Sequence, residues 1–113
     1  MIILQKPISR ESLAEMAGNF YGDMIKGVVD IDRGKLALDA ELHSDLERLL
    51  LEDGSEQESL WGINLYPEVD YEDFLEFDSL INIRPRQNNR SRYVEDAAIR
   101  DAIQKIVNSF IQW

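Results

Sequence analysis

Residues 76–91 read EFDSLINIRPRQNNRS and join an alternating apolar segment to an arginine-rich one. Apolar side chains at 75, 77, 81 and 83 alternate with polar ones at 76, 78 and 82. This period of two predicts a half-buried strand. Pro85 lacks a backbone donor and favours an extended residue before it, so the strand is expected to end near Arg84. The following stretch, 84–92, holds four arginines, two asparagines and no acid.

The rest of the composition fits one domain spanning residues 1–113. Apolar residues make up 44% of the chain and charged residues 30%, values typical of a globular protein. No run of 18 apolar residues is present, so no membrane span is expected. The start, MIILQKPIS, lacks the pattern of a secretory signal. With no cysteine, the chain has no disulfide framework and no thiolate site. These features predict a cytoplasmic protein.

The charge balance argues against one class of function. The chain has 22 acidic residues against 12 lysines and arginines, a net charge of −10. A basic stripe of the kind that binds duplex nucleic acid is absent, so nucleic acid is disfavoured as a partner. The arginine-rich stretch therefore stands out against its surroundings.

Two hairpins are predicted. Residues 24–32 and 35–42 alternate on either side of an Asp-Arg-Gly turn, in which Gly34 suits the left-handed position. Residues 60–66 form another alternating run that Pro67 ends, and a polar connection leads to the strand at 75–84. Residues 1–4 are expected to add an edge strand.

Three helices are predicted around these strands. The first runs from Arg10 to about Asn19 with Ser9 as its N-cap. The second starts at a capping box, Ser44 with Glu47, and is closed by Gly54. The third, 95–113, has Asp96 as N-cap and an apolar stripe with helical spacing.

The predicted order is β-α-β-β-α-β-β-α. It indicates an α+β fold with an antiparallel four- to five-stranded sheet built from two hairpins and helices packed mainly on one face. Five apolar side chains are expected to be buried between the sheet and the last helix: Phe77, Ile81, Ile83, Ile103 and Phe110.

Several segments together resemble a family of small bacterial proteins catalogued as a domain of unknown function. They are ELH at 41–43, LEDGS at 51–55, LWGINLYP at 60–67, FDSLINIRP at 77–85 and NRSR at 89–92. The resemblance covers nearly the whole chain in the same order. It implies a bacterial, single-domain, cytoplasmic protein, and it brings no activity, cofactor or catalytic residue with it.

The arginine-rich loop is the first candidate site. Arginine forms planar, bidentate contacts with carboxylates and phosphates, and the following helix N-terminus adds to the attraction for anions. The alternative is that these arginines pair with the protein's own carboxylates, within the chain or across a subunit interface. The candidate ligand-binding residues are Arg84, Arg86, Asn88, Asn89, Arg90 and Arg92.

The second candidate is a set of acid–base residues. His43 is the only histidine, and Glu76 and Asp78 share the polar side of the predicted strand, with Asn64 available from the neighbouring strand. Such groups serve as acids, bases or Mg²⁺ ligands, and they are also what a solvated sheet face and a helix start contain. One histidine without cysteine predicts no bound transition metal, and no cofactor is expected.

Two readings of function follow from these candidates. The first is a binding or interaction module whose loop engages an anionic group on a small molecule, a protein partner or a sister subunit in a homo-oligomer. The alternative is a small enzyme acting on a phosphorylated substrate, with Glu76 or Asp78 as base or metal ligand and His43 as an acid–base group.

Overall fold

The computed structural model describes residues 1–112 of the chain, and its centre is a five-stranded antiparallel sheet. The strand order is β1-β4-β3-β5-β6. The strands are β1 (Ile2–Ile3), β3 (Ile25–Asp30), β4 (Lys35–Leu38), β5 (Leu60–Leu65) and β6 (Leu75–Glu76). The pairings β3 with β4 and β5 with β6 confirm the two predicted hairpins, and β3 with β5 joins them into one sheet.

The first hairpin shows why its turn could be predicted. Gly34 has φ of 65°, the left-handed conformation that a side chain disfavours, and its N–H donates to the Asp30 carbonyl. The buried Asp30 carboxylate accepts hydrogen bonds from the N–H groups of Asp32 and Arg33 and from the Ser55 hydroxyl. This network ties the turn to the segment that follows the second helix.

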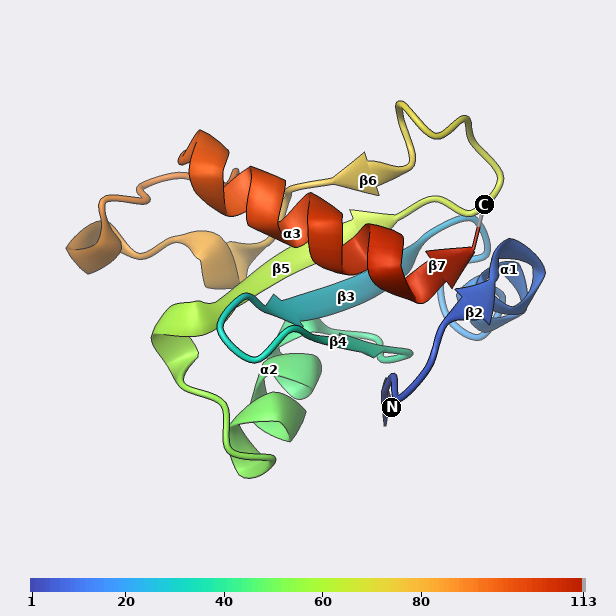
Figure 1. Cartoon of the computed structure of the whole chain (residues 1–113), viewed down its shortest axis with the longest axis horizontal. Helices are drawn as coiled ribbons and strands as arrows, with labels where there is room; N and C mark the ends of the chain where they lie inside the picture. Colours follow the sequence, from blue (N-terminus) through green and yellow to red (C-terminus); the bar gives the residue numbers. More distant parts are fainter. Residues whose placement is uncertain (113) are drawn as a thin grey trace.

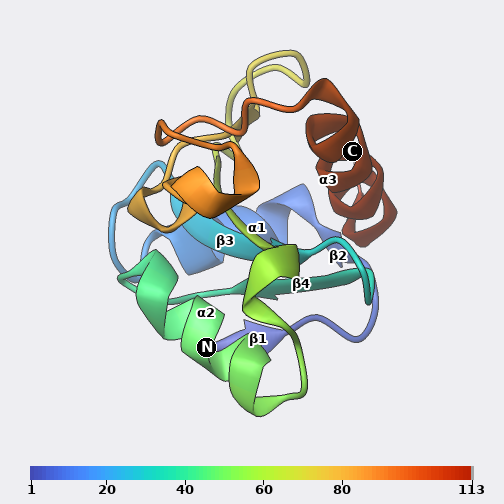
Figure 2. The same cartoon turned by 90° about the vertical axis from the view of Figure 1, so that its left-hand side faces the viewer.

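Helices lie on both faces of the sheet. The first face packs against α1 (Arg10–Ala17) and α3 (Ala97–Phe110). Figure 1 shows α3 crossing the sheet and α1 at one end of it. The second face packs against α2 (His43–Glu52), through Val28, Leu46 and Leu60. Figure 2 shows α2 and α3 on opposite sides of the sheet. Two of the three helices share one face, as expected. All six residues of β5 are buried, because α2 covers Leu60 on the second face and the segment 79–81 covers Gly62.

The strand predicted at 75–84 is mostly not a strand. After the two residues of β6 the chain forms two short 3-10 helices, η2 (Leu80–Asn82) and η3 (Pro85–Gln87). Asn82 is fully buried and Ile83 is 42% exposed, the reverse of the predicted alternation. The cause is the Asn82 side chain, whose amide exchanges hydrogen bonds with the backbone of Gly62. The Asn82 side chain thus bonds to the edge of β5 at Gly62, where the backbone of a neighbouring strand would otherwise bond.

Two helix boundaries also differ from the expectation. The predicted capping box at Ser44 is wrong, because α2 starts at His43 with Leu42 in the N-cap position and no side-chain cap. Asp96 caps α3 as predicted, but residues 111–112 form β7 (Ile111–Gln112) and pair in parallel with β2 (Ile8–Ser9). Trp113, at the end of the predicted helix, lies outside the described residues. Of the residues expected to be buried between the sheet and the last helix, Ile103 is fully buried, and Phe77 and Phe110 are partly buried there. Ile81 is partly buried on the opposite face, against the α2 cluster.

None of the helices in residues 1–112 combines the length and the apolar character needed to cross a bilayer.

Candidate functional site

A row of polar side chains crosses three strands beside the first turn of α2. Lys26 on β3 pairs with Asn64 on β5, and Asn64 pairs with Glu76 on β6. These residues share the sheet face that α2 covers further along, since side chains alternate along each strand and Val28 lies under α2. Polar side chains thus replace the apolar core on this part of the face.

Asn64 is the centre of this row. Its Nδ2 donates to Glu76 Oε1 at 2.8 Å and to the Asp78 carbonyl at 3.1 Å. Tyr66 donates its hydroxyl to the same Glu76 oxygen at 3.0 Å. Partial burial and this hydrogen bond raise the pKa of Tyr66 to about 12. Asn64 Oδ1 is buried and has no hydrogen-bond partner among the described residues.

His43 is held against the sheet by one strong contact. Its Nε2 lies 2.7 Å from the carbonyl oxygen of Ile63. A carbonyl only accepts, so Nε2 carries the proton and the neutral ring leaves Nδ1 unprotonated. Burial lowers the pKa of His43 to about 4, outweighing the hydrogen bond to Ile63, and Lys26 lowers it further. His43 is therefore neutral at neutral pH.

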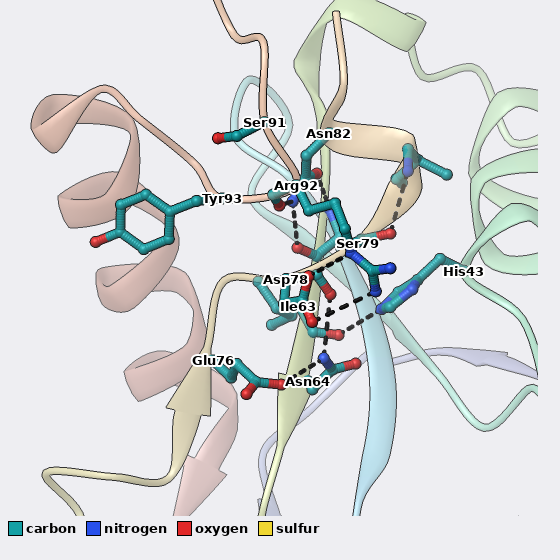
Figure 3. Close-up of polar contacts among 12 residues, drawn as sticks. His43, Ile63, Asn64, Glu76, Asp78, Ser79, Asn82, Ser91, Arg92 and Tyr93 are labelled. Atoms are coloured by element: carbon teal, nitrogen blue, oxygen red, sulfur yellow. Dashed lines mark hydrogen bonds and ion pairs between the residues drawn. The ribbon is translucent and has the colours of Figure 1, made fainter.

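Arg92 and Asp78 form an ion pair beside the histidine, as Figure 3 shows. Arg92 Nε lies 2.6 Å from Asp78 Oδ1, and Nη2 lies 3.4 Å from Oδ2. Both side chains remain about half exposed, so the guanidinium keeps access to solvent. The bidentate geometry fixes its plane.

These groups border a hollow of about 200 Å³, named here the His43 hollow. Two cations, Lys26 and Arg92, lie on its wall, and Lys26 is held 5.2 Å above the ring centre of Tyr21. The first turn of α2 also lines it, with amide groups that no side chain caps. The full lining is Lys26, Leu42, His43, Ser44, Ser79, Leu80, Ile81 and Arg92.

The asparagines of the arginine-rich loop shape the backbone. Asn89 is buried, and its Nδ2 donates to the carbonyls of Asn82, Ser91 and Tyr93. Its Oδ1 accepts from the N–H of Glu95 at 2.8 Å. The exposed Asn88 has φ of 61°, a left-handed conformation that ends η3. The side chain of Asn89 is thus fully engaged within the loop.

Arg84 lies in a second hollow, of about 470 Å³, on the other side of η2. Its guanidinium lies 5.0 Å from the ring centre of Trp61, and Nη2 lies 3.3 Å from Glu47 Oε2. Burial lowers the pKa of Arg84, partly offset by Glu47. Arg86 also lines this cavity, named here the Arg84 hollow.

The four arginines thus divide into two pairs. Arg84 and Arg92 contact carboxylates of the chain itself, as the alternative interpretation expected. Arg86 and Arg90 are exposed, and their side chains form no ion pair with any other residue between 1 and 112. The structure brings His43, Asp78 and Arg92 together, and it links Glu76 to them through Asn64.

A family model described as "Protein of unknown function (DUF5674)" matches residues 2–110. The chain belongs to this family. Searches of curated proteins and of solved structures find no match. Membership in DUF5674 thus confirms the resemblance seen in the sequence, while the assignment of a function rests on the geometry of the site.

Sequence reasoning missed Lys26, Ser79 and the role of Asn82. Lys26 interrupts the apolar run Ile25–Val29, which is a usable signal, but its partners could not be known without the strand register.

In residues 1–112, no group of three or more histidine, aspartate or glutamate side chains could hold a metal ion.

Proposed function

We propose that this protein is a binding module that receives an anionic group, a carboxylate or a phosphate, in the His43 hollow. The main support for this proposal is the positive charge that lines the hollow. Two cations and the uncapped first turn of α2 line the same small hollow, in a chain whose net charge is −10. Amide groups at a helix start carry partial positive charge and bind anions.

The surroundings keep these groups in position without an added ligand. Tyr21 lies below Lys26, and Asp78 fixes the plane of the Arg92 guanidinium. His43 is anchored to Ile63 and starts α2 at a defined place on the sheet. A preorganised site loses less entropy when it binds, which supports a recognition role.

An enzyme acting on a phosphorylated substrate is the second candidate, and the same geometry disfavours it. His43 commits Nε2 to a carbonyl, and with a pKa of about 4 its ring is a poor proton donor at neutral pH. Asp78 pairs with Arg92, and Glu76 accepts from Asn64 and Tyr66. Apart from Nδ1 of His43, the candidate acids and bases are thus engaged in contacts that fix the site.

The test is a titration of isotope-labelled protein with acetate, phosphate and sulfate at constant ionic strength, followed by NMR. The amides of His43 and Ser44 and the Arg92 Nε–H should shift. Lys26→Gln should weaken binding by a factor of about 5, the effect of losing roughly 1 kcal/mol of charge attraction. The matched control is Lys35→Gln on the neighbouring strand β4, outside the hollow. No shift in the first turn of α2, or equal effects of the two substitutions, would contradict the proposal.

A further inference from the structure

Leu80 is 67% exposed, the highest value among the large exposed apolar residues of the described chain. It lies on η2, between the two hollows, and lines both of them. Ile83, 42% exposed, continues the apolar surface. Cations flank it on each side: Lys26 and Arg92 in the His43 hollow, and Arg84 and Arg86 in the Arg84 hollow. These six residues are named here the Leu80 ridge.

The backbone beneath Leu80 is held by buried polar side chains. The Ser79 hydroxyl accepts from the N–H of Ile81, and Asn82 bonds to Gly62 and to the Arg92 carbonyl. Asn89 bonds in turn to the Asn82 carbonyl. Leu80 is therefore presented outward by a fixed turn, and an exposed apolar side chain in a polar rim is typical of a protein interface.

The chain carries a second exposed surface with the opposite charge. Residues 68–73, EVDYED, contain four carboxylates and expose Val69 by 39% and Tyr71 by 50%. Arg10 holds the start of this acidic loop through the carbonyls of Pro67 and Val69. Figure 1 shows the loop, in yellow, and the segment 80–92, in orange, at opposite ends of the molecule.

We infer that the Leu80 ridge docks the acidic loop of a second molecule of this chain, with one loop carboxylate in the His43 hollow. The inference rests on the proposed function, and it names the source of the anion. Sites for whole ligands usually enclose about 300–1,000 Å³. The His43 hollow, at about 200 Å³, is better matched to a single acidic side chain.

Charge and apolar character are complementary across this contact. Lys26 and Arg86 form no ion pair within residues 1–112, and Arg92 stays about half exposed beside Asp78, so these three cations are available to the carboxylates of the loop, whereas Arg84 is held by Glu47. Leu80 and Ile83 would face Val69 and Tyr71. The net charge of −10 opposes association at a distance, but at physiological salt charges are screened beyond about 8 Å, so local contacts dominate. Because the two surfaces differ, the contact is head-to-tail and builds rings or chains of molecules.

The test uses the full chain in sedimentation velocity over a dilution series. The parent protein should associate as its concentration rises. A ridge variant, Leu80→Ser with Arg86→Glu, and a loop variant, Asp70→Lys with Glu72→Lys, should each lose this association. Matched controls make the same changes in charge and in apolar surface elsewhere and should associate like the parent: Leu51→Ser with Lys105→Glu, and Glu15→Lys with Glu52→Lys.

Mixing the two variants gives the sharpest result. Each retains one intact surface, so together they should form one-to-one dimers and nothing larger. A parent protein that stays monomeric, association that survives the ridge substitutions, or a mixture that stays monomeric would each overturn the inference. Acetate binding to Leu80→Ser alone, followed by NMR, tests the proposed function separately. Retained anion binding in a monomeric parent would uphold the anion site and reject the second copy as its occupant.

Discussion

At the scale of single residues, His43 couples the site to the stability of the fold. The ring is buried and neutral, with Nε2–H donated to Ile63 and a pKa of about 4, compared with 6.5 in an unfolded chain. Between these values the unfolded state binds a proton that the folded state does not. Folding is therefore favoured by His43 above pH 6.5, and this contribution falls as the pH drops toward 4.

The first prediction follows from this linkage. His43→Gln keeps a side-chain donor and removes the titration, so the free energy of unfolding should depend less on pH between 6.5 and 4. The loss in the parent attributable to His43 is about 3 kcal/mol over this window, from a lowering of the pKa to about 4. Urea denaturation of both proteins at several pH values measures the difference. Parallel pH profiles would show that folding does not lower the pKa of His43.

A second residue-scale prediction concerns Asn82, which closes the edge of β5. Its Oδ1 accepts from Gly62 N–H at 2.8 Å, and its Nδ2 donates to the carbonyls of Gly62 and Arg92 at 3.0 Å. Asn82→Ala should lower the free energy of unfolding by roughly 3 kcal/mol, because each buried group left unpaired costs about 1–3 kcal/mol. Asn108 provides the control, because its Oδ1 accepts hydrogen bonds from Tyr71 and Gln104 at the exposed surface, where water can replace them, so Asn108→Ala should cost at most about 1 kcal/mol. Equal denaturation midpoints would contradict the role given to Asn82.

At the scale of elements, the contact of β5 with η2 positions both hollows. Gly62 allows it, because a Cβ at this position would lie 2.5 Å from Ser79 Cβ and 2.6 Å from its Oγ. Neither atom is the far end of a long side chain, so the strand and the turn would have to separate. Leu80 and Ile81, which line both hollows, would move with the turn.

The element-scale prediction is therefore made for Gly62→Ala. It should destabilise the protein by about 1–3 kcal/mol, the usual cost of overpacking. It should also weaken anion binding in the His43 hollow. Adding Ser79→Gly should recover part of the loss, although Ser79→Gly alone removes the hydrogen bond to Ile81 N–H. A double-mutant cycle measures this coupling. Additive effects would show that the two residues do not press on each other.

At the scale of the whole molecule, two segments far apart in the sequence, Ile8–Ser9 and Ile111–Gln112, meet in the parallel pair β2–β7. Ile8 pairs with Ile111, and Ile111 is 2% exposed in the core beneath α1 and α3. This pair connects the segment before α1 to the end of α3. The stability of the N-terminal segment should thus depend on residues at the far end of the sequence.

Substitution of Ile111 tests this dependence. Ile111→Ala should cost roughly 2–5 kcal/mol, the range for truncating a buried isoleucine. Ile2→Ala, at a 42% exposed position on the edge strand β1, is the matched control and should cost far less. Hydrogen exchange adds a local readout, because amide protection near Ser9 should fall in the Ile111 variant. Unchanged protection there would show that β7 does not hold β2 in place.

The sequence by itself determined the parts of the fold whose causes are local. The β3–β4 hairpin follows from two alternating runs around Gly34, and the N-caps at Ser9 and Asp96 follow from side chains that accept from the next turn. Each involves residues only a few positions apart. The alternation at 60–65 and 75–76 likewise sufficed for the second hairpin.

Tertiary structure decided what the segment 77–83 became and where the site lies. Its alternating pattern suited a strand, but the Asn82 amide satisfies the Gly62 backbone that a strand would have bonded, so the chain turns and exposes Leu80 and Ile83. The site combines Lys26, His43 and Arg92, which are far apart in sequence and meet only through the register of β3 with β5 and the start of α2. Spatial proximity of this kind depends on packing and leaves no periodic signal along the chain.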